Sequence, residues 1–426
     1  MTTILLLVVF CVILILGAPI GTAMSLSSIA SLLSEKVSLM MIPYNLYSSL
    51  SKYLLLSIPF FILAGNIMEK AGISVRLIRF AQVLVGHIRG GLALVCVVVS
   101  CFFAAISGSG PATVAALGGI VIPAMVKVGY SKGDSAALMA TCGGIGIIIP
   151  PSISFVVYAS IAGISTGKLF MSGIVPGVLM GAALFAASMW VTRKTDLERR
   201  EKATGQERWK AFREAFWGLM MPVIILGGIY GGLFTPTEAA AVSAIYGLIV
   251  GVFVYKTLKW KDILEIIKVT GVQVGSLMWV IGCAALMSWV LTVSGIAAAT
   301  TDLISRAAHG NTAIFLLIVN IVVLIAGCFI DGNSIMYIFV PVFLPVAMQL
   351  GYDLFALGVV MTMNVAIGMI TPPVGMNLYV ASGIAGTPVK EVVRSILPYF
   401  LASLAVLLLI TYLPSVVTFL PNLLGM

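Results

Sequence analysis

Two segments of this sequence concentrate glycine, serine, asparagine and proline within apolar surroundings. The first is Ser107-Gly108-Ser109-Gly110-Pro111 and the second is Asp331-Gly332-Asn333-Ser334. Each is followed about 35 residues later by a glycine-rich stretch that ends in two prolines, Pro150-Pro151 or Pro372-Pro373. Glycine and proline release backbone carbonyls from helical hydrogen bonds, and carbonyl and hydroxyl oxygens are ligands for sodium, while half-helix N-termini offer N–H groups to a carboxylate. The pattern predicts a site for sodium ions and a small organic anion.

Asp331 sharpens this interpretation. An ionisable side chain in an apolar membrane hairpin is costly and indicates a functional site by default, and Asp331 occupies the position that corresponds to Ser109 in the first segment. The alternative is that the tip of the hairpin reaches water. Glu238 also leaves two interpretations open, because Thr235 or Thr237 together with Glu238 can cap a helix that begins after a proline.

Helices in a membrane must position these segments. The chain has 426 residues, of which 61% are hydrophobic and only 9% are charged, so it has too little polar surface to coat a water-soluble globule. Apolar stretches of about 20 residues, the length that crosses a hydrocarbon core, recur along nearly the whole sequence without the alternation of a barrel strand. We therefore expect an all-α polytopic membrane protein.

Charge and cysteine usage argue against other classes of protein. The formal net charge is +9, and the densest basic cluster lies in one short hydrophilic segment, where such residues set membrane topology, so no nucleic-acid partner is expected. The six cysteines lie in or beside apolar segments without metal-ligand spacing, and we interpret them as small buried side chains. No cofactor is expected apart from sodium as the coupling ion.

The chain contains an internal sequence repeat. Pro123 and Pro345, Gly146 and Gly368, and the two proline pairs are all separated by 222 positions. A constant spacing of this kind predicts two homologous halves, residues 1–192 and 215–426. The hydrophilic linker between them, 193–214, is expected in the cytoplasm because it has eight basic residues, Arg193, Lys194, Arg199, Arg200, Lys202, Arg208, Lys210 and Arg213.

Each half is expected to contain a re-entrant helical hairpin followed by a broken, discontinuous helix. The expected bounds are about 107–128 and 133–163 in the first half, and about 329–350 and 355–384 in the second. Repeats of this kind in transporters are commonly inverted, with the binding site near the membrane midplane. Two inverted repeats require an odd number of crossings in each half and place the N-terminus outside.

Motifs along essentially the whole chain resemble those of a known family. They are Ile58-Pro59-Phe60-Phe61, Leu63-Ala64-Gly65, Ser107-Gly108-Ser109-Gly110, Ile149-Pro150-Pro151-Ser152, Phe234-Thr235-Pro236-Thr237-Glu238-Ala239 and Thr371-Pro372-Pro373. In this order they resemble the large membrane (permease) subunit of tripartite ATP-independent periplasmic (TRAP) transporters. The resemblance implies a bacterial inner-membrane protein with an elevator mechanism coupled to a sodium gradient. It also implies two partners, a small four-helix membrane subunit and a soluble periplasmic substrate-binding protein.

The resemblance also implies which residues form the sites. The first sodium site would be formed by Ser107, Ser109, Gly144 and Gly146, and the second by Asp331, Gly332, Asn364 and Gly368. The substrate carboxylate would lie between the hairpin tips, near Ser109, Asn333, Ser154, Ser165 and the pair Pro150-Pro151. Sialic-acid members of the family have an arginine in the second half, where this chain has Leu291-Thr292-Val293-Ser294-Gly295, and this difference argues against a sialic-acid substrate.

Other classes of function fit the residues less well. A serine hydrolase needs a base beside Ser109, but the only histidines, His87 and His309, lie beside basic or polar loop residues, so an enzyme is not expected. A channel would keep a continuous polar pathway, whereas the polarity here is confined to two interruptions. A stand-alone sodium-coupled carboxylate transporter that needs no binding protein stays open as the alternative.

Overall fold

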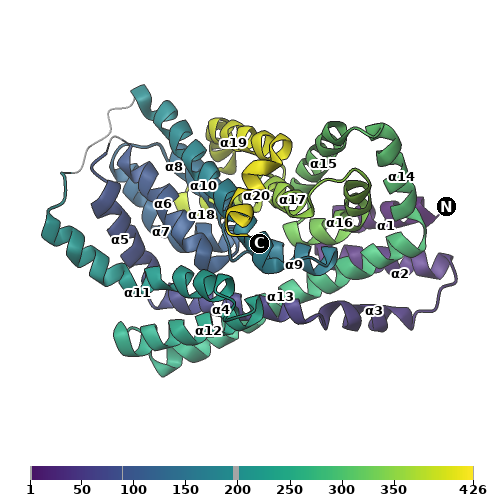
Figure 1. The fold of residues 1–426 in the computed structure, drawn as a ribbon, viewed down its shortest axis with the longest axis horizontal. Helices are drawn as coiled ribbons and strands as arrows, with labels where there is room; N and C mark the ends of the chain where they lie inside the picture. Colours follow the sequence, from purple (N-terminus) through teal and green to yellow (C-terminus); the bar gives the residue numbers. More distant parts are fainter. Residues whose placement is uncertain (1, 89, 195–200, 426) are drawn as a thin grey trace.

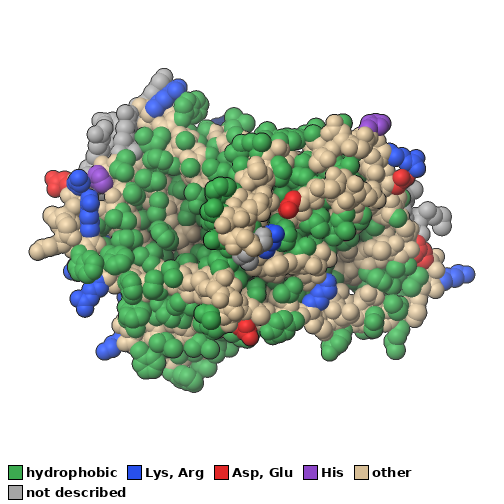
Figure 2. Space-filling view, viewed as in Figure 1, with side chains coloured by type: hydrophobic (Ala, Val, Ile, Leu, Met, Phe, Trp, Pro, Cys, Tyr) green, Lys and Arg blue, Asp and Glu red, His purple; other side chains and the backbone are tan. Residues whose placement is uncertain are grey.

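The computed structural model describes residues 2–88, 90–194 and 201–425, and the regular structure in these ranges is entirely helical (Figure 1). Eight of the described helices are long and apolar enough to cross a membrane. Hydrophobic side chains are spread across the face seen in Figure 2, as expected for a lipid-exposed protein. The expectation of an all-α polytopic membrane protein is confirmed.

The described part of the first half contains ten α-helices, a short 3₁₀ helix, Tyr53–Leu56, before the fourth, and a 3₁₀ turn, Thr192–Lys194, after the tenth. The α-helices are α1 (Thr2–Ile15), α2 (Ile20–Ser34), α3 (Met41–Leu50), α4 (Ser57–Lys70), α5 (Ile73–Val85), α6 (Gly91–Ser107), α7 (Gly110–Lys127), α8 (Lys132–Ile145), α9 (Ile153–Ala162) and α10 (Thr166–Val191).

The second half repeats this succession, with one fusion and one addition. Its helices are α11 (Gly205–Tyr230), α12 (Pro236–Ile249), α13 (Trp260–Val293), α14 (Ile296–Ala308), α15 (Thr312–Gly327), α16 (Gly332–Gln349), α17 (Leu354–Gly368), α18 (Met376–Ala385), α19 (Val389–Tyr412) and α20 (Pro414–Leu423). The single helix α13 takes the place of α3 and α4, and α20 has no counterpart. Gly72 and Gly295 precede the matching helices α5 and α14, with φ of 74° and 70° in the left-handed region that favours glycine.

The linker is partly helical. Part of it, 195–200, which includes Arg199 and Arg200, lies outside the described residues. The helix α11 begins inside the linker at Gly205, where Thr204 and Glu207 form a reciprocal capping box. Thr235 and Glu238 form the same box at the start of α12: the Thr235 amide donates to the Glu238 carboxylate at 2.8 Å. The capping interpretation of Glu238 is therefore confirmed.

Most of the helices fall into two groups, and α5, α14 and α20 are assigned to neither. The scaffold group, α1 to α4 and α11 to α13, is organised around α13, which packs against α2, α3 and α4, while α12 packs against α4 (Figure 1). The core group, α6 to α10 and α15 to α19, contains two helical hairpins, α6 with α7 and α15 with α16, and two broken helices, α8 with α9 and α17 with α18. The expected ranges 107–128 and 329–350 contain each hairpin's tip and second arm; α6 and α15 are the first arms.

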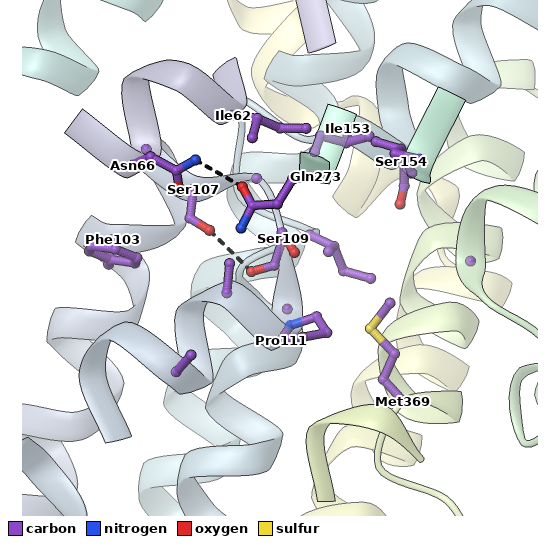
Figure 3. A pocket seen from close by; sticks show the side chains of 18 of the residues that line it. Ile62, Asn66, Phe103, Ser107, Ser109, Pro111, Ile153, Ser154, Gln273 and Met369 are labelled. Atoms are coloured by element: carbon purple, nitrogen blue, oxygen red, sulfur yellow. Dashed lines mark hydrogen bonds between the residues drawn. The ribbon is translucent and has the colours of Figure 1, made fainter. Parts of the chain in front are cut away.

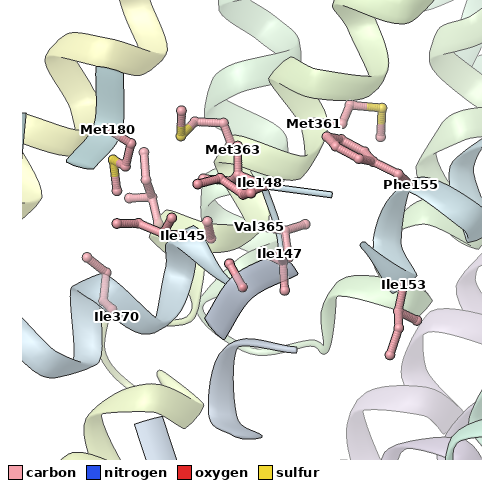
Figure 4. Packing of buried hydrophobic residues seen from close by; sticks show 14 of the residues in the cluster. Ile145, Ile147, Ile148, Ile153, Phe155, Met180, Met361, Met363, Val365 and Ile370 are labelled. Atoms are coloured by element: carbon pink, nitrogen blue, oxygen red, sulfur yellow. The ribbon is translucent and has the colours of Figure 1, made fainter. Parts of the chain in front are cut away.

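The broken helices form the centre of the core group. Every residue from 135 to 159 is buried, as is every residue from 356 to 368. Figure 4 shows Ile145, Ile147 and Ile148, around the first break, packed among Met363 and Val365 of α17. Irregular backbone is tolerated at membrane depth only inside protein or beside a water-filled cavity, and this packing meets that condition for the first break.

Candidate functional site

A cavity of about 470 Å³ lies where the scaffold group meets the two hairpin tips (Figure 3). Its walls come from α4 and α13 of the scaffold, the α6–α7 tip, the start of α9, and the start of α16. The polar or charged side chains that line it belong to Asn66, Glu69, Ser107, Ser109, Ser154, Gln273 and Asn333. A concave site with few polar groups on apolar walls is typical of small-molecule recognition.

A glycine in the left-handed conformation forms the turn at the first hairpin tip, and two hydroxyl groups fix it by hydrogen bonds. Gly108 has φ of 61°, and Ser109 is extended as α7 begins. The Ser107 hydroxyl donates to the carbonyl oxygen of Ser109 at 3.2 Å, and the Thr113 hydroxyl donates to the same oxygen at 2.8 Å. The tip thus gathers hydroxyl and carbonyl oxygens at one edge of the cavity.

Gly146 completes a cluster of oxygen atoms at this tip. A Cβ built on Gly146 would lie 2.6 Å from the Thr113 hydroxyl oxygen, 2.9 Å from the Gly143 carbonyl oxygen and 3.1 Å from the Ser109 carbonyl oxygen. The structure therefore brings Ser107, Ser109 and Gly146 together, as the resemblance implied. Gly144 lies to one side of the cluster, where it packs against Ala366 of α17.

The second tip is organised differently. The Asp331 carboxylate caps α16: it accepts hydrogen bonds from the amides of Asn333 and Ser334, both at 3.1 Å, and from the Ser334 hydroxyl at 2.5 Å. Asp331 is partly buried. Gly332, beside it, packs against Val365 of α17. The Asp331 carboxylate thus stabilises the start of α16.

Asn364 and Gly368 lie deeper, on α17. The Asn364 amide donates to the Asn320 side chain at 2.8 Å, and Asn320 donates to the Thr411 hydroxyl at 3.1 Å. The side-chain oxygen of Asn364 is buried without a hydrogen-bond partner among the described residues. Gly368 touches the backbone of Gly327, at the end of α15. The Asn364 amide therefore bonds to Asn320 of α15 and to the Val360 carbonyl of its own helix, while the hydrogen bonds of Asp331 stay within its own tip.

The residues expected near the substrate are only partly brought together. Ser109, Asn333 and Ser154 line the cavity, and the side-chain oxygen of Asn333 is buried without a hydrogen-bond partner among the described residues. The Pro150-Pro151 pair stands behind the first tip, where the Pro151 carbonyl oxygen is 2.9 Å from a Cβ built on Gly108. Ser165 is exposed and caps α10 instead of lining the cavity.

Comparison with known proteins identifies the family. The model of the family described as the tripartite ATP-independent periplasmic transporter, DctM component, matches residues 7–416. This chain belongs to the DctM family. The C4-dicarboxylate TRAP transporter large permease protein DctM of Rhodobacter capsulatus is 41% identical over 96% of both chains, and that of Pseudomonas aeruginosa is 44% identical over 90% of this chain and 89% of its own. The resemblance seen in the motifs is confirmed, and the chain is a multi-pass inner-membrane protein of a transporter family.

A solved structure shares the fold. The YdaH transporter of Alcanivorax borkumensis, described as having an unusual topology, matches 87% of this chain and 86% of its own with a TM-score of 0.63. The two sequences are only 15% identical, so the likeness concerns the fold alone.

Sequence reasoning missed the scaffold wall of the cavity in this DctM-family permease. The Asn66 amide of α4 donates to the side chains of Thr270 and Gln273 on α13, both at 2.8 Å, and Figure 3 shows Asn66 and Gln273 beside Ser107 and Ser109. An available signal was that Asn66 directly follows Leu63-Ala64-Gly65 in an apolar helix, where a polar amide needs a partner.

Two further polar residues at the first tip were not predicted from the sequence. Thr113 lies one turn after Ser109, but the position 222 residues later is Ile335, so the repeat gave no signal. Asn377, at the start of α18, donates to the Ala140 carbonyl at 3.0 Å and leaves its side-chain oxygen buried without a partner among the described residues. It thereby joins the second half to the helix behind the first tip.

Proposed function

We propose that this chain is the transmembrane transport subunit of a sodium-coupled secondary transporter that imports a small organic anion delivered by a periplasmic binding protein. The family description names a tripartite periplasmic system. Relatives that are 34% to 44% identical are named for C4-dicarboxylates, isethionate, sialic acid and 2,3-diketo-L-gulonate, which are all organic anions. The isethionate relative, named DctMQ, matches over only 65% of its own length, which supports a small membrane subunit as a second partner.

The charge of the cavity carries this proposal. No lysine or arginine side chain is among the described residues that line it, and Glu69 is the one ionisable residue that does. The negative charge of a carboxylate must therefore be balanced by the N-termini of α7 and α16 and by bound cations. Oxygen atoms that converge on Gly146 are of the type that sodium takes as ligands.

We assign the first sodium ion to the cluster of Ser107, Ser109, Thr113 and Gly146, with Gly144 as a packing neighbour. The second ion is assigned to the region between the second tip and α17, with Asp331, Gly332 and Asn364 as the candidate ligands and Gly368 as a packing neighbour. The substrate carboxylate is assigned to the space between Ser109, Asn333 and Ser154. The chemistry is binding and movement, and no catalysis is proposed.

Uptake into proteoliposomes tests the proposal. The chain is reconstituted with its small membrane subunit, and uptake of radiolabelled succinate, isethionate and a sugar acid is measured with and without an inward sodium gradient and with and without the binding protein. We expect uptake to require both the gradient and the binding protein. Equal uptake with and without the sodium gradient would contradict sodium coupling. Sodium-driven uptake without the binding protein would instead establish the stand-alone carboxylate transporter.

The Asp331→Asn variant separates capping from ion binding. Asparagine keeps a side-chain oxygen for the amides of Asn333 and Ser334, so α16 stays capped, but the negative charge is lost. We expect the sodium concentration for half-maximal uptake to rise roughly tenfold, the change that about 1.4 kcal/mol produces. Asp353→Asn is the matched control, because Asp353 caps α17 in the same way from an exposed position. If the sodium concentration for half-maximal uptake changes equally in the two variants, Asp331 acts only as a helix cap.

We also propose that the core group moves past the scaffold group as an elevator. The Lys52→Ala variant tests whether a contact between the two groups biases this motion. The Lys52 ammonium donates to the Ser160 carbonyl of α9 at 2.9 Å, which joins the two groups in this conformer. Losing an exposed hydrogen bond of about 0.5–1.5 kcal/mol in Lys52→Ala is expected to shift the conformational equilibrium about 2- to 10-fold.

The shift is measured with a cysteine at Ala112, a cavity residue of the core group, after the six native cysteines are replaced. Labelling by an impermeant maleimide is compared from the two sides of the membrane, and the ratio of the two rates should change. Lys261→Ala, an exposed charge on α13, is the control. An unchanged ratio in Lys52→Ala would show that this contact does not bias the motion.

A further inference from the structure

A second pocket, of about 590 Å³, shares no lining residue with the substrate cavity and opens between α5, α11 and the segment after α12. Its polar or charged side chains belong to Arg76 and Arg79 of α5, Glu214 of α11, and Tyr255. Figure 2 shows basic side chains at the end of the molecule where Figure 1 places α5 and α11. With two arginines and one glutamate, the pocket has an excess of positive charge.

Arg76 is fixed in a position that leaves one edge of its guanidinium available. Its guanidinium carbon lies over the ring of Tyr255, 3.8 Å from the centroid, and one terminal nitrogen donates to the carbonyl oxygens of Ala71 and Gly72 at 3.0 and 2.8 Å. No acidic side chain among the described residues pairs with it. A planar guanidinium that is held by stacking and has free donors suits bidentate contact with a phosphate.

The rest of the pocket supports the same ligand. Arg79 pairs with Glu214 at 3.0 Å, and the Tyr255 hydroxyl donates to the Glu214 carbonyl at 2.8 Å, so the second arginine is also held at the rim. Glu214 offsets only one of the two positive charges, and it lowers the affinity of the pocket for an anion without abolishing it.

The position of the pocket relative to the membrane indicates the source of the phosphate. The first turns of α11 carry Glu207, Arg208, Lys210, Arg213 and Glu214, and the helix becomes apolar from Ala215 onward. We expect the basic linker in the cytoplasm, which puts this end at the cytoplasmic face. Three exposed aromatic side chains lie near the pocket residues in sequence, Trp209, Phe253 and Trp260, and such side chains are typical of the membrane–water interface. Phosphates at this depth belong to lipid headgroups.

The equivalent positions of the second half have no arginine. The helix α14 corresponds to α5 and follows the same left-handed glycine, but Ala299 and Asp302 occupy the positions of Arg76 and Arg79. If the repeats are inverted, α14 faces the opposite side of the membrane. The arginine pair is therefore specific to the first half and is not shared by the repeat.

We propose that Arg76 and Arg79, with the ring of Tyr255, bind the phosphate headgroup of an anionic phospholipid of the cytoplasmic leaflet. The site tethers α5, which packs against both α11 of the scaffold group and α6 of the core group, to the membrane surface. The inference does not depend on the transported substrate.

Native mass spectrometry of the full chain, purified in detergent, tests the site with added phosphatidylglycerol or phosphatidylcholine. We expect phosphatidylglycerol to be retained preferentially, and Arg76→Gln to lower its retention about 5-fold, the effect of one arginine near the surface. Arg306→Gln, an exposed arginine on α14, is the matched control and should retain wild-type binding. Equal retention by Arg76→Gln and Arg306→Gln would overturn the proposal.

Glu214→Gln keeps the test decisive if Arg76→Gln does not fold. It removes the one carboxylate in the pocket and frees Arg79, so retention of phosphatidylglycerol should rise, whereas weaker or unchanged retention would count against the site. Inorganic phosphate is the remaining arm. If it displaces phosphatidylglycerol at low millimolar concentration, the pocket binds free anions, and the assignment to a lipid is wrong.

Discussion

Gly146→Ala is expected to reduce sodium-driven uptake about 5- to 150-fold, the range that corresponds to an overpacking cost of about 1–3 kcal/mol. The added methyl group would enter the oxygen cluster, 2.6 Å from the Thr113 hydroxyl and 2.9 Å from the Gly143 carbonyl oxygen. Neither atom can retreat easily: Thr113 is held by its hydrogen bond to Ser109, and Gly143 is main chain in a buried helix. The methyl group would occupy the space that we assign to the ion.

The measurement compares uptake with the thermal stability of the purified protein, with and without sodium. A ligand that binds the folded state raises its stability, so the wild-type protein should melt at a higher temperature in sodium, and Gly146→Ala should lose most of that rise. Gly119→Ala is the control, because this glycine is exposed on α7 and a Cβ there meets no atom within 4 Å. A Gly146→Ala protein that keeps the sodium-dependent rise would place the ion elsewhere.

The broken helices were predictable because their causes are local. Glycine and two successive prolines interrupt helical hydrogen bonding wherever they occur, and a spacing of 222 positions showed that the same interruption occurs twice. The expected breaks near Gly146 and Gly368 accordingly coincide with the ends of α8 and α17. The tips at Ser109 and Asp331 were found for the same reason, since each starts a helix after a glycine-containing or polar turn.

The walls of the cavity were not predictable, because they depend on which helices face each other. Asn66 and Gln273 are distant in sequence, and only the packing of α4 against α13 brings them within hydrogen-bonding distance at the cavity. The same argument explains Ser165, which the family resemblance placed near the substrate but which serves as a helix cap. A buried polar residue needs a hydrogen-bond partner, but only the tertiary structure determines which residue that partner is.

The two halves differ in what fills the equivalent space. Beside Gly146 the neighbours are oxygen atoms of Ser109, Thr113 and Gly143, whereas beside Gly368 they are main-chain atoms of Gly327. The two glycines correspond in the repeat, but the first leaves room at an oxygen cluster and the second permits two helices to touch. A shared sequence position thus supports a shared fold without requiring identical chemistry, and substitution of the second glycine should have a different signature.

Gly368→Ala is expected to destabilise the protein by about 3 kcal/mol or more, at the upper end of overpacking costs, and to abolish uptake through that loss. A Cβ on Gly368 would lie 2.6 Å from the Cα of Gly327 and 2.8 Å from its carbonyl carbon, and main-chain atoms cannot turn aside as a flexible side chain does. Thermal unfolding should therefore show a lower midpoint by the same amount with and without sodium. Gly383→Ala, on α18, is the control, since its Cβ meets no atom within 4 Å. A normal midpoint combined with lost sodium dependence would instead make Gly368 part of the second ion site, because the backbone would then have accommodated the methyl group while the ion had not.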